Sequence, residues 1–218
     1  MSEYEYVKKS EYAPVRRELE EIIHRVQGEM KKSYGMTFQF RLIGSGSRHL
    51  ITRIRNGNSG YDFDYNLMLL PPEDGYVYRA GVIKRNFMEA FKVALRGTQY
   101  SFPKDSTSAL TIKVVDKSGK RIIHSCDFAI IYYGTHDDTD GYFYLRNNKI
   151  QNTYEFAFRP LKSHIDEKVC EICNTPNGWD FIRDEYLYLK NRNQNRKKHS
   201  FSLYIEAVNN VYNQLFYQ

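Results

Sequence analysis

The sequence predicts a two-layer α+β protein with a mixed, mainly antiparallel sheet, flanking helices and a helical C-terminal part. Before residue 160, apolar and polar residues alternate in several stretches, and other stretches there show helical spacing; beyond residue 161 only helical stretches follow. With 218 residues, 41% of them apolar, the chain can build one large domain or one domain with a small helical appendage. We expect an α+β core over residues 1–160 and a C-terminal helical part over residues 161–218.

The first half of the predicted core combines one helix with two strands. Apolar side chains at helical spacing predict an amphipathic helix over residues 17–30, and Gly35 ends it. Alternation predicts strands over residues 37–43 and 61–70, and the prolines that follow stop the second strand. Between the strands lies the turn Gly44-Ser45-Gly46-Ser47, which we expect to lead into a short helix.

The rest of the chain is predicted to hold a helix, two hairpins and two further helices. Gly97 closes the helix, and a stretch of turn-forming residues at 116–120 joins the strands of the first hairpin. The predicted bounds are 83–94 for the helix, 110–115 with 121–131 and 142–146 with 154–159 for the hairpins, and 179–191 and 201–216 for the last helices.

The net charge and the cysteine content indicate which ligands the protein attracts and in which compartment it folds. A net charge of +6 attracts polyanions such as nucleotides or RNA, although many basic proteins bind neither. Cys126, Cys170 and Cys173 are too few for a disulfide framework, which favours a reducing compartment. We interpret the last two as semi-buried thiols on a helix rather than a zinc or redox motif. Without a signal peptide or a long apolar run, we expect no membrane association and a cytoplasmic location.

The stretch GYDFDYNL at residues 60–67 places two carboxylates in a strand otherwise suited to burial. Asp62 and Asp64 share one face of that strand, because successive side chains point to opposite faces. Asp127 interrupts a second apolar strand. Such charges are costly unless a cation or a shared proton offsets them. Three carboxylates converging at one sheet edge would supply the hard oxygen ligands of Mg²⁺ or Mn²⁺, and we expect them to hold two ions.

The Gly-Ser turn at residues 44–47 predicts the second half of a site. Glycine lets the backbone approach a ligand closely, and the amides at a helix start can face phosphate oxygens. Alone, such a turn is most often an ordinary loop. A phosphate cradle followed by paired carboxylates in the next strand indicates a nucleotide ligand.

The segments IGSGSRHLITRIRNGNSGYDFDYNLML and HSCDFAII resemble the DNA polymerase β-type nucleotidyltransferase superfamily. Its pattern is a Gly-Ser turn, a strand with two spaced aspartates and a single aspartate in a later strand, and the match extends over about residues 38–131. The resemblance implies that Asp62, Asp64 and Asp127 are catalytic and bind divalent metal ions. It also implies that Gly44 and Ser45 hold the triphosphate of a nucleoside triphosphate (NTP).

The resemblance suggests further nucleotide contacts around this motif. Ser47 ends the turn and Arg48 follows it, and both are candidates for contacts with the phosphates. An inserted turn at residues 56–60 lengthens the interval to the aspartates. The segment WDFIRDEYLYLKNRN is similar to the helical segment that closes over the nucleotide in the oligoadenylate-synthetase-like branch. This similarity implies that Arg183 and Lys190 contact the triphosphate or the base.

The function that the resemblance implies is transfer of a nucleoside monophosphate from an NTP to an acceptor hydroxyl, with release of pyrophosphate. The acceptor could be RNA, another nucleotide, a protein or a small molecule, and the sequence leaves these alternatives open. One rival interpretation is a catalytically inactive nucleotide- or RNA-binding module. Another is the toxin of a toxin–antitoxin pair, which is an enzyme held inactive by a regulatory protein partner.

Overall fold

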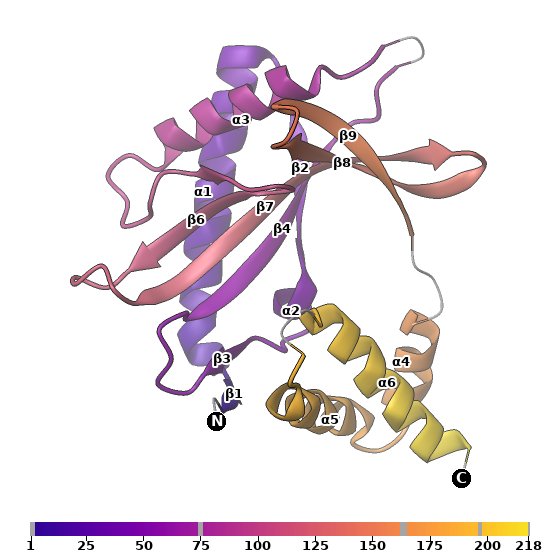
Figure 1. The fold of residues 1–218 in the computed structure, drawn as a ribbon. Coiled ribbons are helices and arrows are strands. Elements are labelled where there is room, and N and C mark those ends of the chain that lie inside the picture. Colours follow the sequence, from indigo (N-terminus) through magenta and orange to yellow (C-terminus); the bar gives the residue numbers. More distant parts are fainter. Residues whose placement is uncertain (1–2, 74–75, 162–164, 196–197, 218) are drawn as a thin grey trace.

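The computed structural model describes residues 3–73, 76–161, 165–195 and 198–217. A twisted sheet forms its main layer, and α1 (Lys9–Tyr34) and α3 (Ala80–Ala94) pack together against one face (Figure 1). The helices α4 (Ile165–Cys173), α5 (Gly178–Arg192) and α6 (Ser200–Phe216) gather near α2 (Gly44–Ser47) (Figure 1). The strands are β1 (Tyr4–Tyr6), β2 (Phe38–Ile43), β3 (Thr52–Ile54), β4 (Tyr61–Leu69), β5 (Lys104–Asp105), β6 (Leu110–Val115), β7 (Ile122–His136), β8 (Thr139–Asn148) and β9 (Thr153–Pro160).

The main sheet has the strand order β2-β4-β7-β6-β5, and β8 pairs with β7 and with β9. The strands β4 and β7 run parallel, whereas the other paired strands of this sheet are antiparallel. The first part of β7 pairs with β6 and its second part with β8, so one long strand serves both hairpins. This topology confirms the predicted mixed, mainly antiparallel sheet. A separate small sheet pairs β1 with β3.

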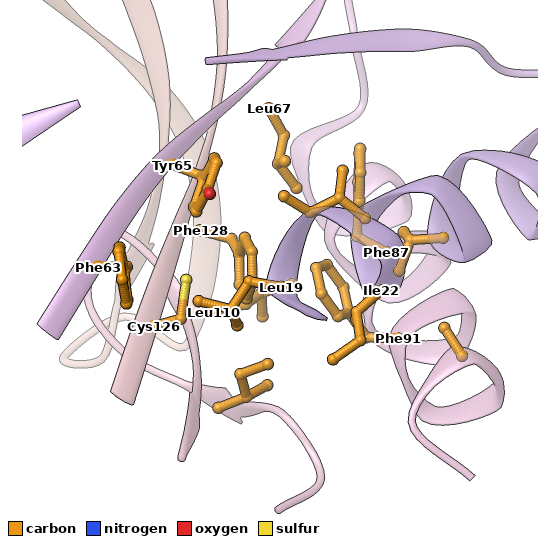
Figure 2. Close-up of a cluster of buried hydrophobic side chains, with 14 of the residues drawn as sticks. Leu19, Ile22, Phe63, Tyr65, Leu67, Phe87, Phe91, Leu110, Cys126 and Phe128 are labelled. Carbon is orange, nitrogen blue, oxygen red and sulfur yellow. The ribbon is translucent and has the colours of Figure 1, made fainter. Parts of the chain in front are cut away.

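Alternation along β4 decides which face of the sheet is covered. Phe63, Tyr65 and Leu67 are fully buried, whereas the alternate residues Asp62 and Asp64 keep contact with solvent. Fully burying a side chain of this size contributes roughly 1.5–3 kcal/mol, so the apolar face fixes the register and leaves the aspartates on the other face. Figure 2 shows these residues facing Leu19 and Ile22 of α1 and Phe87 and Phe91 of α3, together with Leu110 of β6 and Cys126 and Phe128 of β7.

A second apolar cluster, which we call the C-terminal cluster, joins α4, α5 and α6. Its buried members include Ile172, Ile182, Tyr186 and Val208 from these helices and Leu50 from the segment after α2. The cluster therefore fixes the C-terminal helices beside the Gly-Ser turn. The boundary near residue 160 stays a prediction.

The hairpins, β2, β4 and the last two helices agree with the predicted elements within a few residues. The short helix expected after Gly44–Ser47 is wrong, because these four residues form the helical turn α2 themselves and β3 follows. The first helix begins at Lys9, well before the predicted start, and continues through Pro14. The structure adds β1, β3, β5 and α4, none of which was predicted from the sequence.

Cys170 and Cys173 lie on α4, as expected for thiols on a helix, but both are exposed. They were predicted to be semi-buried, and that prediction is wrong because α4 turns Ile172 into the C-terminal cluster instead. In the described parts of the chain, no helix combines the length and the apolar character needed to cross a membrane.

Candidate functional site

The aspartates predicted from the sequence come together because β4 and β7 are parallel neighbours. Asp64 lies directly opposite Asp127 in the register of these strands, and Asp62 lies opposite Ser125. Hydroxyl groups of adjacent strands hold two of the carboxylates: Ser125 Oγ donates a hydrogen bond to Asp62 Oδ1, and Thr111 Oγ1 donates to Asp127 Oδ1 at 2.5 Å. Neither Ser125 nor Thr111 was a candidate from the sequence.

The environment of these carboxylates opposes their negative charge. Burial, followed by the charges of Asp127 and Asp62, raises the pKa of Asp64 to about 6. Burial also raises the pKa of Asp127, although the hydrogen bond from Thr111 counteracts part of this effect. Among the residues that the structure describes, no lysine, arginine or histidine forms an ion pair with any of the three aspartates. The site therefore concentrates negative charge that a bound cation would neutralise.

The chemistry of this donor set fits a hard divalent cation, since it consists of carboxylate oxygens that lack a positive partner. The side chains are not pre-arranged, however: within the described residues, no group of three or more His, Cys, Asp or Glu side chains is arranged to hold a metal ion. The hydrogen bonds from Ser125 and Thr111 engage two of the carboxylates. Metal binding by the three aspartates thus stays a prediction.

The Gly-Ser turn approaches these carboxylates so closely that a side chain at position 44 would press against Asp64. Its φ of 65° lies in the left-handed region, and a Cβ at this position would lie 2.7 Å from Asp64 Oδ2. The carbonyl oxygen of Gly44 accepts hydrogen bonds from Ser47 Oγ and from an Arg48 Nη1, each at 3.0 Å. The turn is thereby fixed with its backbone against the acidic site.

A cavity of about 250 Å³ lies between the carboxylates and the C-terminal helices. Arg48 forms part of its wall, and its guanidinium stacks over the rings of Tyr204 at 4.6 Å and Phe201 at 5.5 Å, both from α6. The cavity is lined by Gly44, Ser45, Arg48, Leu50, Thr52, Asp62, Asp64, Asp127, Tyr186, Lys190, Ser200, Phe201 and Tyr204.

Lys190 is the cation of α5 that reaches this cavity. Its Nζ donates to Thr52 Oγ1 at 2.9 Å and lies 4.5 Å from the centre of the Tyr4 ring. Burial lowers the pKa of Lys190 to about 8, although the negative charge of Asp62 acts in the opposite direction. Lys190 is therefore a cation whose charge is readily lost just above neutral pH.

The structure separates the remaining candidates from the cavity. Arg183 lies on α5 with its guanidinium 4.6 Å from the centre of the Tyr6 ring, and it lines a different cavity. Ser47 lies on α2 but does not line the cavity of the carboxylates. Conversely, Phe201 and Tyr204 line the cavity and were not predicted, because their helical spacing gives no indication of Arg48 as a partner.

A second cavity, of about 230 Å³, adjoins the first. Asp64 and Asp127 line both cavities, so the pair stands in the wall between them. On the far side, the Arg159 guanidinium lies 4.7 Å from the centre of the Tyr144 ring, and Tyr142 also lines the space. Two cavities meeting at one carboxylate pair can hold two reactants side by side.

Comparisons with solved structures identify proteins of similar fold. The Vibrio cholerae cyclic AMP-GMP synthase DncV, solved with nonhydrolyzable GTP, is 12% identical over 94% of this chain and 68% of its own, with a TM-score of 0.57. Escherichia coli CdnC, solved with ATP, is 14% identical over 94% of this chain and 62% of its own, with a TM-score of 0.51. The Elizabethkingia meningoseptica cyclic dinucleotide synthase CdnE, solved with GTP and Apcpp, is 14% identical over 89% of this chain and 69% of its own, with a TM-score of 0.51.

Comparisons of the sequence itself give no match, either to a protein-family profile or to a curated protein. The chain spans 62% to 69% of the length of the three structures named above. Structural similarity at identities this low establishes only the fold. The activity has to be argued from the site. The chain has the nucleotidyltransferase fold of the structures compared above, as its resemblance to the DNA polymerase β-type superfamily predicts.

Proposed function

We propose that the protein is a metal-dependent nucleotidyltransferase that moves a nucleoside monophosphate from an NTP to an acceptor hydroxyl and releases pyrophosphate. The observation that carries this proposal is the position of Asp64 and Asp127, opposite each other on parallel strands and lining both cavities. A donor in one cavity and an acceptor in the other would meet at these carboxylates. The shared fold supports the same conclusion, since CdnC was solved with ATP, CdnE with GTP and Apcpp, and DncV with nonhydrolyzable GTP.

The NTP would occupy the cavity beside the Gly-Ser turn. Arg48 and Lys190 line it and supply positive charge for the triphosphate. Gly44 and Ser45 place their backbone at the same wall, next to Asp64. Phe201, which is partly exposed, offers a ring face for the nucleobase. Ser47 and Arg183 have no place in this arrangement.

The acceptor would occupy the second cavity. Arg159 brings a positive charge and Tyr142 and Tyr144 bring aromatic rings to its lining. A guanidinium binds phosphate oxygens and tyrosine rings stack with bases, so this lining favours a nucleotide or an RNA end over a neutral small molecule or a protein. The similar cyclic dinucleotide synthases support a nucleotide acceptor.

The reaction forms a bond between the acceptor oxygen and the α-phosphorus while the bond to the bridging oxygen breaks, and pyrophosphate leaves with that electron pair. The hydroxyl proton would pass to Asp127, which lines both cavities and whose pKa burial raises. Two Mg²⁺ or Mn²⁺ ions held by Asp62, Asp64 and Asp127 would supply charge neutralisation for the phosphates. Arg48 and Lys190 would orient the triphosphate for in-line attack.

Thermal unfolding with each NTP, with and without Mg²⁺, tests this proposal without knowledge of the acceptor. A ligand at about 100 times its dissociation constant stabilises the native protein by roughly 2.7 kcal/mol. The matched variant is Asp62→Asn, which keeps an oxygen acceptor for Ser125 and removes one charge. We expect an NTP-dependent rise of the unfolding midpoint that requires Mg²⁺ and is lost in the variant. If no NTP stabilises the wild type, the proposed donor site is wrong.

Two further readouts separate the proposal from its rivals. An inactive nucleotide- or RNA-binding module would bind an NTP but release no pyrophosphate with any acceptor. A toxin would arrest growth when expressed, and the arrest would disappear on replacing Asp62 and Asp64 with alanine. A regulatory protein partner and a cytoplasmic location stay predictions.

A further inference from the structure

A cavity of about 430 Å³ lies outside the proposed reaction site, where the N-terminal segment meets α1 and α5. Figure 1 shows β1 beside β3 and close to α5. In the described residues, the cavity shares no lining residue with the one at the carboxylates. Its volume falls in the range of small-molecule sites, which is about 300–1,000 Å³.

The charged residues that line this cavity are all cationic. Lys8 and Lys9 at the start of α1 and Arg183 of α5 face it, and in the described part of the chain its lining contains no Asp or Glu. None of these cations forms an ion pair with a described residue. Arg183 is held against the Tyr6 ring, and Tyr6 Oη donates to the Arg183 carbonyl oxygen at 2.6 Å. Unpaired cations gathered around one hollow favour an anionic ligand.

Apart from Val7, aromatic side chains supply the rest of the lining. Tyr12 is buried and its hydroxyl lies 2.9 Å from His49 Nδ1, with the two rings stacked at a centroid distance of 6.4 Å. Trp179 is half-buried at the cavity, and among the described residues its indole has no ring contact and no hydrogen-bond partner. Trp179 also packs against the C-terminal cluster, which fixes its ring beside the cavity. The part of the ring that stays exposed can stack on a planar ligand, and its N–H can donate a hydrogen bond to that ligand.

We propose that this cavity binds a small planar molecule with two or more negative charges, at a site separate from nucleotidyl transfer. The cations select for charge, and the half-buried ring of Trp179 selects for a flat ligand. The proposal does not depend on the activity proposed above, because none of its residues lines the carboxylate cavity.

The test uses Trp179 as its own reporter, since it is the single tryptophan of the chain. The probe is trimesate, a benzene ring with three carboxylates, and citrate is the matched control because it carries the same charge without a planar ring. Titration of tryptophan fluorescence should give a saturable change with trimesate and an affinity for citrate that is at least about tenfold weaker. Equal responses to both anions would overturn the proposal, because they would reveal only a general anion-binding surface.

Variants then locate the bound probe. Lys9→Gln and Arg183→Gln should each weaken trimesate binding by about tenfold, whereas Lys117→Gln in the exposed turn before β7 should leave it unchanged. Unfolding midpoints verify that each variant folds. The proposal is wrong if trimesate gives no saturable change, or if all three variants bind it as the wild type does. NTP binding should survive Lys9→Gln and trimesate binding should survive Asp64→Asn, so failure of either proposal is seen independently.

Discussion

Replacing Asp64 with asparagine should stabilise the metal-free protein near neutral pH. The folded environment raises the pKa of Asp64 from 3.8 to about 6, mainly through burial and secondly through Asp127 and Asp62. The unfolded chain therefore ionises this group more easily than the folded protein does. Above the folded pKa of about 6 the full cost of the charged carboxylate opposes folding. This cost shrinks as the pH falls towards 3.8 and disappears below that value, because the group is then neutral in the unfolded chain as well as in the folded protein.

The magnitude follows from the difference between the two pKa values. One pKa unit corresponds to about 1.4 kcal/mol, so a rise from 3.8 to about 6 amounts to about 3 kcal/mol near pH 7. For a chain of this length, that gain should raise the unfolding midpoint by roughly 6–12 °C. Near pH 4 the difference between variant and wild type should fall below about 1 kcal/mol.

Urea unfolding of both proteins at the two pH values, without divalent cations, measures this difference. Asp140→Asn, at an exposed position of β8, is the control that removes a carboxylate of the same kind without burial. With Mg²⁺ the order should reverse, since the cation stabilises only the protein that keeps Asp64. A variant less stable than wild type near pH 7, or a gain of equal size at both pH values, would refute the reasoning.

Three further predictions concern the cavity beside the Gly-Ser turn, where we place the NTP. NTP affinity should fall as pH rises through about 8, where Lys190 loses its charge, and titration calorimetry should find no such fall in Lys190→Arg. Gly44→Ala should destabilise the protein and abolish NTP binding, because its Cβ would lie 2.7 Å from a carboxylate oxygen. Gly97→Ala is the control, since Gly97 has a φ of 75° and no atom within 4 Å of an added Cβ. In unfolding experiments its free energy of unfolding should fall only by the cost of the strained backbone, and NTP binding should persist. Tyr204→Leu should weaken NTP binding several-fold by releasing Arg48, and an unchanged dissociation constant would contradict that role.

Local patterns predicted much of the fold because alternation and helical spacing are properties of neighbouring residues. The face of β4 that carries Asp62 and Asp64 follows directly from the apolar residues between them. The pairing of Asp64 with Asp127 does not, because it depends on β4 and β7 lying side by side and parallel. Resemblance to a known family, rather than periodicity, indicated that these carboxylates belong to one site.

The cations of α5 show where sequence reasoning reaches its limit. Arg183 and Lys190 are seven residues apart, so they lie on nearly the same side of the helix but about 10 Å apart along its axis. Which one reaches the carboxylate cavity depends on where α5 crosses β1 and β3. The structure places Lys190 there and Arg183 in the other cavity. The contact of Arg48 with Tyr204 is equally non-local, since it needs the C-terminal cluster to fix α6 beside α2.

The most direct test of nucleotidyl transfer is incubation of the protein with mixed NTPs, one at a time labelled at the α-phosphate, in the presence of Mg²⁺. The NTPs also serve as acceptors, and products are treated with phosphatase before separation. We predict phosphatase-resistant label together with released pyrophosphate, and neither product with Asp64→Asn. Folded wild-type protein that binds an NTP and Mg²⁺ but transfers no label to a nucleotide or to added RNA would contradict the proposed function.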